Sequence, residues 1–288
     1  MSALGFYLVY PFVYLIASLP FWALYSVSDV FYYLFRLSGY RRKVVVQNLR
    51  NSFPDKSEKE IQQLCREYFR YLCDLTLETF KTLTMTEQEA RDRCTLIFPD
   101  WLKEFANQKQ SMLLVLGHYG NWEWGGPGFT LHSGIPLNVI YRPLSNPYFE
   151  KMMTGMRTKF GTRITPAKNT LREMVSLRSQ HMAFAFIADQ AATIENGHWM
   201  EFLHQDTSVY TGPEKLAVKF NYPVVFMNIK RLRRGFYEVA PELLFAHPKE
   251  TQPDQITETF TRRLEQEIRK DPVIWLWSHR RWKHKRPA

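Results

Sequence analysis

The sequence predicts one α/β domain, built on a mostly parallel central sheet flanked by helices and preceded by an N-terminal membrane-anchoring helix. Three observations lead to this fold class. The chain has 288 residues, a length that suits one large α/β domain. Its first 28 residues carry no charged side chain. From about residue 95 onward, short apolar runs alternate with helical patterns, as expected for a parallel sheet covered on both faces.

Residues 1–35 are interpreted as an uncleaved membrane anchor or interfacial segment, and residues 36–288 as the main domain. The run Ala3–Val27 is long enough to cross a bilayer, which takes about 20 apolar residues. Pro11 and Pro20 indicate a kinked span, or a short helix followed by an interfacial one. Positive charges on the following flank place the rest of the chain in the cytoplasm: Arg36, Arg41, Arg42 and Lys43. A cleaved signal peptide and a buried core helix are the alternatives.

Two capping boxes mark the start of helices between this segment and the sheet. Ser57 with Glu60 opens a long amphipathic helix, and Thr86 with Glu89 opens a shorter one, since each pair can satisfy two free backbone N–H groups. The sheet and its covering helices are expected beyond them. The predicted strands are Met112–Leu116, Leu137–Tyr141, Met182–Ala188 and Val224–Ile229. The predicted helices are Asn146–Phe160, Lys168–Gln180, Gly212–Phe220 and about Asp254–Lys270.

Charge and cysteine content limit the partners and the compartment. The formal net charge is +10 and the pI is about 9.4, which predicts an anionic partner such as nucleic acid, an anionic membrane, a phosphorylated lipid or an acidic carrier protein. Cys65, Cys73 and Cys94 lack C-x-x-C spacing. They are therefore expected to be buried, unpaired residues in a reducing compartment rather than a disulfide framework or zinc site.

The strongest candidate for chemistry lies where the first buried strand ends. After Leu116 and Gly117, His118 emerges at the strand's carboxyl end, and Asn121 can cap a helix that carries Glu123 in its first turn. An imidazole and a carboxylate on either side of one tight turn can meet. The carboxylate then accepts from one ring nitrogen and leaves the other free as a base. A structural histidine and a glutamate that complements the helix dipole are the alternative interpretation.

Polar residues at other strand ends are expected at the same edge of the sheet. Arg142 follows the second predicted strand, and its fork of donors suits a phosphate or a developing oxyanion. Asp189 and Gln190 follow the third predicted strand. A surface arginine and a capping aspartate are the corresponding structural interpretations.

Two further segments are candidates for substrate contact. Gly212 opens a helix whose first backbone N–H groups can hold an anion, although simple helix initiation explains the same residues. The ending from Ser278 to Arg286 combines Lys and Arg with Trp282 and two histidines. This composition is typical of binding to nucleic acid or anionic headgroups. Because an apolar W-L-W precedes it, His279 and Arg280 are better placed than the last residues to touch a substrate.

Several motifs together resemble a known family. The segment G-H-Y-G-N-W-E around His118 is similar to the H-x-x-x-x-[DE] signature of glycerolipid-type acyltransferases, and most resembles the late lipid A acyltransferases of the lauroyl/myristoyl transferase branch. The resemblance covers nearly the whole chain. It includes Y-R-P from Tyr141, A-D-Q from Ala188, T-G-P-E-K-L-A from Thr211 and W-L-W-S-H-R-R-W-K from Trp275.

The resemblance implies a glycerolipid acyltransferase-like fold and a catalytic domain over residues 36–288. It implies that His118 deprotonates an acceptor hydroxyl, that Glu123 orients and charges the imidazole, and that Asp189 and Gln190 belong to the site. The implied donor is acyl carrier protein or acyl-CoA, and the acceptor is a lipid A precursor or a related membrane glycolipid. The implied location is the cytoplasmic face of a bacterial inner membrane.

The acyltransferase interpretation excludes some partners, and other functions are alternatives to it. It requires no cofactor, metal or nucleic acid, and metal-binding spacings such as H-E-x-x-H are absent from the sequence. The alternatives are a non-catalytic membrane protein that binds anionic lipid or nucleic acid, an acyltransferase for another lipid, and a hydrolase that activates water with the same pair.

Overall fold

A computed structural model describes residues 3–190, 192 and 197–286 of the chain. The helices are α1 Ala3–Ser18, α2 Phe21–Ser38, α3 Arg42–Ser52, α4 Glu58–Lys81, α5 Glu87–Arg93, α6 Asp100–Asn107, α7 Trp122–Ser133, α8 Pro147–Thr158, α9 Thr170–Ser176, α10 Gly212–Phe220 and α11 Gln255–Lys270. The strands are β1 Cys94–Leu96, β2 Met112–Leu116, β3 Leu137–Tyr141, β4 Arg163–Pro166, β5 Ala183–Ile187, β6 Gly197–Phe202, β7 Gln205–Tyr210, β8 Val224–Arg233 and β9 Phe236–Phe245. Short 3-10 turns cover Ala167–Asn169, Pro248–Glu250 and Pro272–Ile274.

The central sheet is mostly parallel, as predicted. Its seven strands lie in the order β1-β9-β8-β2-β5-β3-β4. The five strands from β8 to β4 run parallel, whereas β9 pairs antiparallel with β8 and carries β1 parallel to itself. The reversal follows from the short β8–β9 connection, where Gly235 adopts a φ of +74° that suits a tight turn. The carboxyl ends of β2, β5 and β3 therefore lie side by side at one edge.

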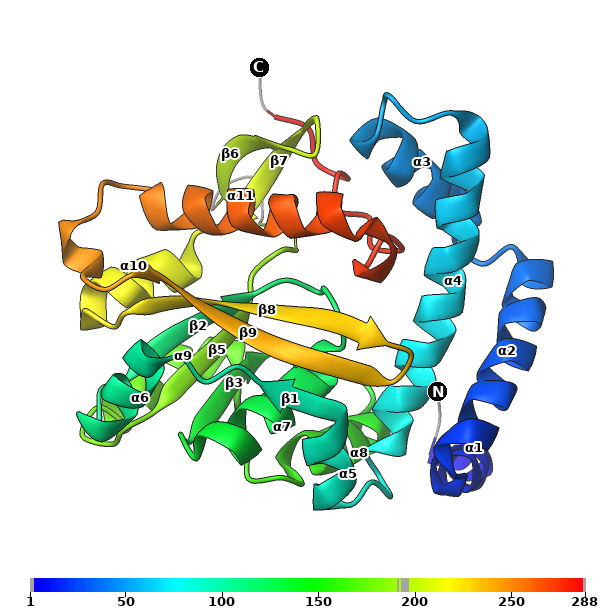
Figure 1. The fold of residues 1–288 in the computed structure, drawn as a ribbon, viewed down its shortest axis with the longest axis horizontal. Helices are drawn as coiled ribbons and strands as arrows, with labels where there is room; N and C mark the ends of the chain where they lie inside the picture. Colours follow the sequence, from blue (N-terminus) through cyan, green and yellow to red (C-terminus); the bar gives the residue numbers. More distant parts are fainter. Residues whose placement is uncertain (1–2, 191, 193–196, 287–288) are drawn as a thin grey trace.

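Helices bury both faces of this sheet. Leu113 and Val115 of β2 point into a core shared with α4, α10 and α11, whereas Leu114 and Leu116 point into a second core shared with α6 and α7. Figure 1 shows α11 above the sheet and α5 and α7 below it. All five residues of β2 are buried, which explains its continuous apolar run in place of polar alternation. The helix-flanked α/β domain predicted from the sequence is thus confirmed.

The two capping boxes are also confirmed. Ser57 accepts from the backbone N–H of Glu60 at the start of α4, and Thr86 accepts from that of Glu89 at the start of α5. All three cysteines are buried and unpaired, as expected.

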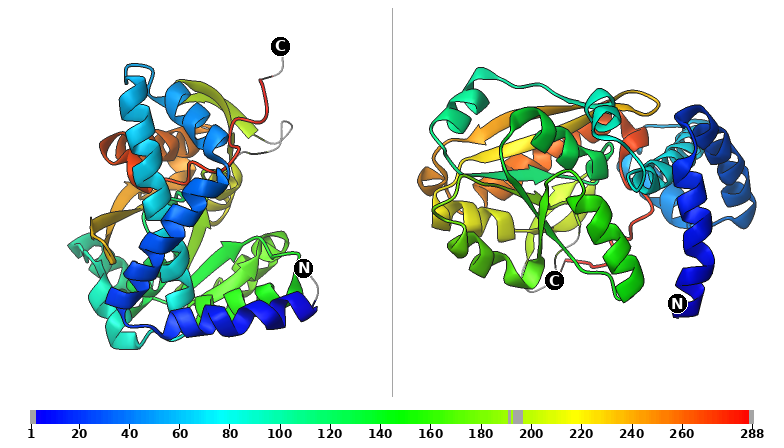
Figure 2. Two further views of the ribbon diagram at one scale, coloured as in Figure 1. Left: turned by 90° about the vertical axis from the view of Figure 1, so that its right-hand side faces the viewer. Right: turned by 90° about the horizontal axis from the view of Figure 1, so that it is seen from below.

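The N-terminal segment forms two helices that pack along α4. Helix α1 continues through Pro11. The helical structure is interrupted between Ser18 and Phe21, at the position of Pro20. Figure 2 shows α1 and α2 meeting at an angle, with α2 running beside α4. Within the described part of the chain, no helix combines the length and apolar character needed to cross a membrane.

Candidate active site

The turn after β2 holds His118 at the carboxyl edge of the sheet. Asn121 caps α7, because its side-chain oxygen accepts from the backbone N–H of Trp124 at 3.0 Å. Gly120 is fixed on both sides: its N–H donates to the carbonyl oxygen of Ile274 at 3.0 Å, and its own carbonyl oxygen accepts from the Tyr71 hydroxyl at 2.6 Å. The predicted strand–turn–helix arrangement is therefore present, and neighbouring elements make it rigid.

Gly120 leaves no room for a side chain. Its φ is +63°, and a Cβ there would lie 2.0 Å from the carbonyl oxygen of Ile229. We expect Gly120→Ala to lower the free energy of unfolding by about 3 kcal/mol, since it combines left-handed backbone strain with a backbone clash. Gly134 is a matched control, because it has a φ of +68° and open space around it. Gly134→Ala should cost only about 1 kcal/mol. Equal urea-denaturation midpoints for the two variants would contradict this account.

His118 is held by Asp189, which follows the neighbouring strand. Residues Leu116 of β2 and Ile187 of β5 are register partners, so the residues two positions further along face each other across the sheet edge. The Nδ1 atom of His118 lies 2.6 Å from Oδ1 of Asp189, and the backbone N–H of His118 donates to Oδ2 at 2.8 Å. Asp189 thus binds the histidine through both ring and backbone. This leaves Nε2 as the ring nitrogen that Asp189 does not contact.

The predicted contact between His118 and Glu123 is wrong. Both oxygens of Glu123 accept from Arg157 of α8, at 2.9 Å from Nε and 2.7 Å from Nη2. Glu123 is the second residue of α7. In this bidentate pair each carboxylate oxygen accepts one N–H of the guanidinium. Trp122, not Glu123, lies beside the histidine ring, with ring centroids 5.0 Å apart. The carboxylate that orients His118 is therefore Asp189.

A cavity of about 370 Å³ opens beside the free side of the imidazole. Four of the predicted site residues line it, together with Arg157, which the sequence analysis missed. The lining includes His118, Glu123, Arg142, Arg157 and Gln190, next to apolar residues of α7 and β3. Arg142 is exposed at the carboxyl end of β3. The cavity therefore combines one base and two guanidinium groups with apolar walls.

Gln190 lies against the free nitrogen of the histidine. Its side-chain Nε2 is 3.3 Å from Nε2 of His118. With Nδ1–H donating to Asp189, the imidazole Nε2 carries a lone pair that can accept from this amide. The same lone pair is the one available to a substrate hydroxyl.

Asp189 is surrounded by groups that favour its charged form. The indole N–H of Trp275 donates to Oδ2 at 2.8 Å, and the buried Arg281 lies close enough to act on it electrostatically. Burial opposes ionisation, but His118 and Arg281 outweigh it and hold the pKa of Asp189 well below its usual range. For Arg281, burial lowers the pKa of the guanidinium to about 10. The surroundings of Asp189 therefore favour a negative charge next to the imidazole.

The C-terminal segment contributes differently from the prediction. Trp275 and Trp277 are buried, so the expected docking of W-L-W into the fold is confirmed. His279 is half-buried, and burial lowers the pKa of its imidazole. Arg280 is exposed, and neither residue is among those that line the cavity in the described part of the chain. Arg280 was the predicted contact, whereas the arginine that acts electrostatically on Asp189 is Arg281.

Gly212 opens α10, as predicted, but that helix supplies none of the described residues that line the cavity. A Cβ at Gly212 would lie 2.1 Å from the ring of Tyr210. Close packing against this ring accounts for the glycine.

Among the described residues, no group of three His, Cys, Asp or Glu side chains is arranged to hold a metal ion.

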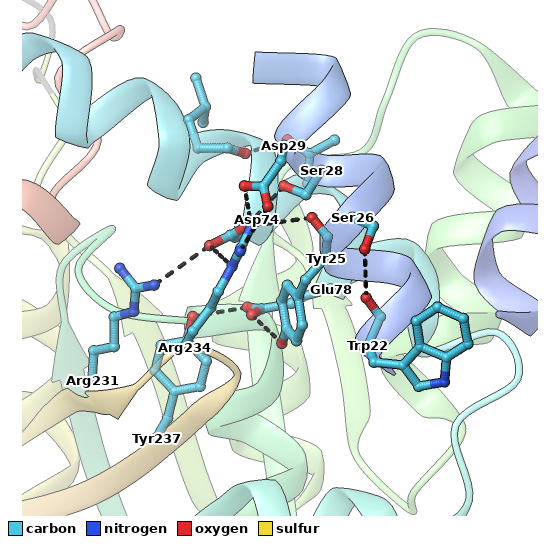
Figure 3. A network of polar contacts seen from close by, with 12 residues as sticks. Trp22, Tyr25, Ser26, Ser28, Asp29, Asp74, Glu78, Arg231, Arg234 and Tyr237 are labelled. Atoms are coloured by element: carbon cyan, nitrogen blue, oxygen red, sulfur yellow. Dashed lines mark hydrogen bonds and ion pairs between the residues drawn. The ribbon is translucent and has the colours of Figure 1, made fainter. Parts of the chain in front are cut away.

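A buried carboxylate, Glu78 of α4, supports the turn that holds His118. It accepts from the side-chain amide of Asn121 and from the hydroxyls of Tyr25 and Tyr237, each at 2.8 Å. Figure 3 shows Glu78 between Tyr25 and Tyr237, with Asp74 one turn away on the same helix. Asn121 is thus held by two sets of hydrogen bonds, one to its helix and one to Glu78.

Glu78 should make stability depend on pH. Burial raises the pKa of its carboxyl above the ordinary value of 4.5, despite the hydrogen bonds from Tyr237 and Tyr25. Between pH 4.5 and the raised pKa of the folded state, Glu78 is more protonated in the native protein than in the unfolded chain. Its contribution to the free energy of unfolding therefore falls as the pH rises through the pKa of the folded state. Glu78→Gln removes the titration. We expect its free energy of unfolding to improve relative to wild type as pH rises from 4.5, measured by urea denaturation. Parallel pH curves for the two proteins would contradict it.

The comparisons with known proteins identify the family of this chain. The family model of the bacterial lipid A biosynthesis acyltransferases matches residues 1–284. The chain is similar to a lipid A biosynthesis palmitoleoyltransferase of Escherichia coli, with 24% identity over 84% of this chain and 79% of the relative. It is similar to a lipid A biosynthesis acyltransferase of Haemophilus influenzae, with 24% identity over 93% of this chain and 86% of the relative. The chain therefore belongs to the bacterial lipid A biosynthesis acyltransferase family, and it is an acyltransferase.

Proposed function

We propose that this protein transfers a fatty acyl chain from an acyl thioester to a hydroxyl of a lipid A precursor or a related membrane glycolipid. The thioester is carried by acyl carrier protein or by coenzyme A. The observation that carries the proposal is the His118–Asp189 pair, whose free ring nitrogen faces a cavity with two guanidinium groups. A base oriented by a buried carboxylate is the arrangement that activates a hydroxyl.

In the proposed reaction, His118 acts first as base and then as acid. Its Nε2 takes the proton from the acceptor hydroxyl while that oxygen attacks the thioester carbonyl carbon. The new C–O bond forms, the C–S bond breaks, and the leaving thiolate receives the proton from the imidazolium. Asp189 stabilises the imidazolium through its contact with Nδ1. No acyl-enzyme is required, because the base serves the acceptor directly.

The two arginines are proposed to bind the anionic parts of the reacting molecules. Arg142 is exposed at the mouth of the cavity, where it can contact a phosphate or the oxyanion of the tetrahedral intermediate. Arg157 is fixed by Glu123, so its remaining donors are held in one orientation. Glu123 is thus proposed to act on the reaction through Arg157, as a positioning residue.

Membrane attachment is proposed for α1 and α2. These helices expose large apolar side chains, including Phe12, Trp22 and Leu37, which are 67%, 76% and 85% exposed. An apolar surface of this kind on helices is typical of attachment to a bilayer interface. The net charge of +10 favours an anionic surface. We propose attachment at the cytoplasmic face of the bacterial inner membrane, where a lipid acceptor is within reach.

The test is a reconstituted acyl transfer. The detergent-solubilised protein is incubated with acyl–acyl carrier protein, or separately with acyl-CoA, and with a Kdo-modified tetra-acylated lipid A precursor. The lipid is then weighed by mass spectrometry. We expect a mass gain of one acyl group that depends on active protein, and the two donor reactions identify the preferred thioester. Free fatty acid as the main product, whether or not acceptor is present, would indicate a hydrolase and contradict the proposal.

A further inference from the structure

A second, larger cavity lies between the N-terminal helices and α4. It has a volume of about 820 Å³, within the range of about 300–1,000 Å³ that ligand pockets occupy. Its walls come mainly from apolar residues of α1, α2 and α4, such as Val13, Phe31 and Leu72, with Phe149 of α8 at one side. The described residues that line it share no member with the cavity beside His118. It is therefore a separate site.

This groove is open, and its composition suits hydrocarbon. Phe12 and Leu34 line it and are 67% and 56% exposed. Side chains of this size cost free energy when they face water, about 25 cal/mol for each Å² of apolar surface. Few polar side chains are among its described lining residues, and they include the hydroxyls of Ser38, Tyr40 and Thr76. The lining therefore favours a ligand that is mainly apolar.

A basic pocket adjoins one end of the groove. The two share Phe35 and Tyr40, whose rings pack edge to face with centroids 5.7 Å apart. The basic pocket has a volume of about 300 Å³, and three guanidinium groups line it, those of Arg36, Arg42 and Arg66. No carboxylate is among the described residues of its walls. Three exposed cations without an acidic neighbour favour a phosphate.

We propose that the groove and the basic pocket together bind one anionic phospholipid of the surrounding bilayer. The acyl chains lie in the groove, and the phosphate lies on Arg36, Arg42 and Arg66. The proposal rests on the membrane attachment proposed above for α1 and α2, and it assigns to these helices a specific lipid in addition to general contact with the bilayer. The reacting hydroxyl of the acceptor lies at the other cavity, beside His118.

The test uses the full chain bound to vesicles of phosphatidylethanolamine and phosphatidylglycerol. A fraction of the phosphatidylglycerol carries a photoreactive diazirine at the end of one acyl chain, and labelled peptides are mapped by mass spectrometry. We expect label on α4 between Leu72 and Phe80, which lines the groove. A lipid that only surrounds the protein should instead label outward residues such as Leu8 and Leu15.

Two variants test the two halves of the site. Thr76→Trp fills the groove from an exposed position of α4 and should lower labelling of α4 roughly fivefold. Arg66→Glu should lower it roughly tenfold, because it removes an attraction to the phosphate and adds a repulsion. Gln63→Trp and Lys59→Glu are matched controls on the same helix, outside both pockets, and should label like wild type.

Three results would overturn the proposal. The first is label confined to outward positions and insensitive to Thr76→Trp. The second is loss of α4 labelling when a lipid A precursor is added but not when unlabelled phosphatidylglycerol is added, which would make the groove part of the acceptor site. The third is labelling of α4 that is the same in Arg66→Glu as in the wild type. Failure of the wild-type chain to bind vesicles would overturn the membrane attachment as well, whereas acyl transfer in detergent tests the proposed reaction independently.

Discussion

Replacement of His118 with alanine is expected to reduce kcat for acyl transfer by about 10³- to 10⁴-fold, because the reaction then loses the oriented base that we propose for it. The side chain is largely buried, and its Nδ1 is fixed at 2.6 Å from Asp189. Water in the vacated space has neither the basicity of the imidazole nor its position. The measurement is the rate of acyl addition to the lipid acceptor, followed by mass spectrometry at saturating concentrations of both substrates.

His132→Ala is the control for this variant. His132 lies in the last turn of α7, where its ring contacts the backbone carbonyl of Arg91 at 3.1 Å. It is far along the helix from the catalytic turn, so activity should stay within about threefold of wild type. If His118→Ala retained a tenth or more of the wild-type rate with normal thermal stability, another group would have to be the base.

Asp189→Asn is expected to reduce kcat by about 10²- to 10³-fold. The asparagine keeps the shape of the side chain, but its amide group can present N–H to Nδ1 and so favour the wrong tautomer of His118. It also removes the charge that stabilises the imidazolium and leaves the buried Arg281 without its counter-charge. Thermal unfolding of the variant separates this second effect from the loss of rate, because a folded but slow protein reports on the histidine.

Glu123→Gln provides the sharpest comparison with Asp189→Asn. Glu123 contacts Arg157 and not the imidazole, so its loss should mainly raise KM by weakening the orientation of Arg157. The expected fall in kcat is about tenfold or less. A larger loss of kcat in Glu123→Gln than in Asp189→Asn would show that Glu123 is the partner of His118 during the reaction, as the sequence alone suggested.

Much of the fold could be predicted because its buried strands and helix starts carry strong local signals. The bounds of β2 and β3 coincide with the predicted strands, and α10 coincides with the predicted helix Gly212–Phe220. The strands that were missed have weak local patterns. Strand β9 contains Glu238, Pro241 and Glu242 within an apolar run, and it is a strand because β8 and β1 pair with it. Strand β8 extends through Lys230–Arg233 because these residues pair with β9, although in the sequence they look like a charged loop.

The positions of the candidate site residues were easier to predict than their pairing. His118, Asp189 and Arg142 each follow an apolar run, so the sequence predicts all three at one edge. Which carboxylate meets the imidazole depends on strand order, because β5 lies directly beside β2 although more than 60 residues separate them along the chain. Sequence spacing does not show strand order, so it favoured Glu123, which lies near His118 along the chain, as the partner of the imidazole. Arg157 and Glu78 lie in helices with no local signal of chemistry. Trp275 begins a motif of the family resemblance, but its contact with Asp189 joins distant parts of the chain, so only the tertiary structure shows it.

The hydrogen bonds of Glu78 have a consequence for how the protein can be handled. Tyr25 of α2 donates to this carboxylate, and Ser28 of the same helix donates to Asp74, so the N-terminal helices help complete a buried network that supports the start of α7. Trimming the chain before Arg42 to obtain a soluble enzyme would leave these carboxylates short of donors next to the catalytic turn. A truncated form should therefore be a weak surrogate for the native enzyme, and inhibitor screening calls for the full-length protein in detergent or nanodiscs.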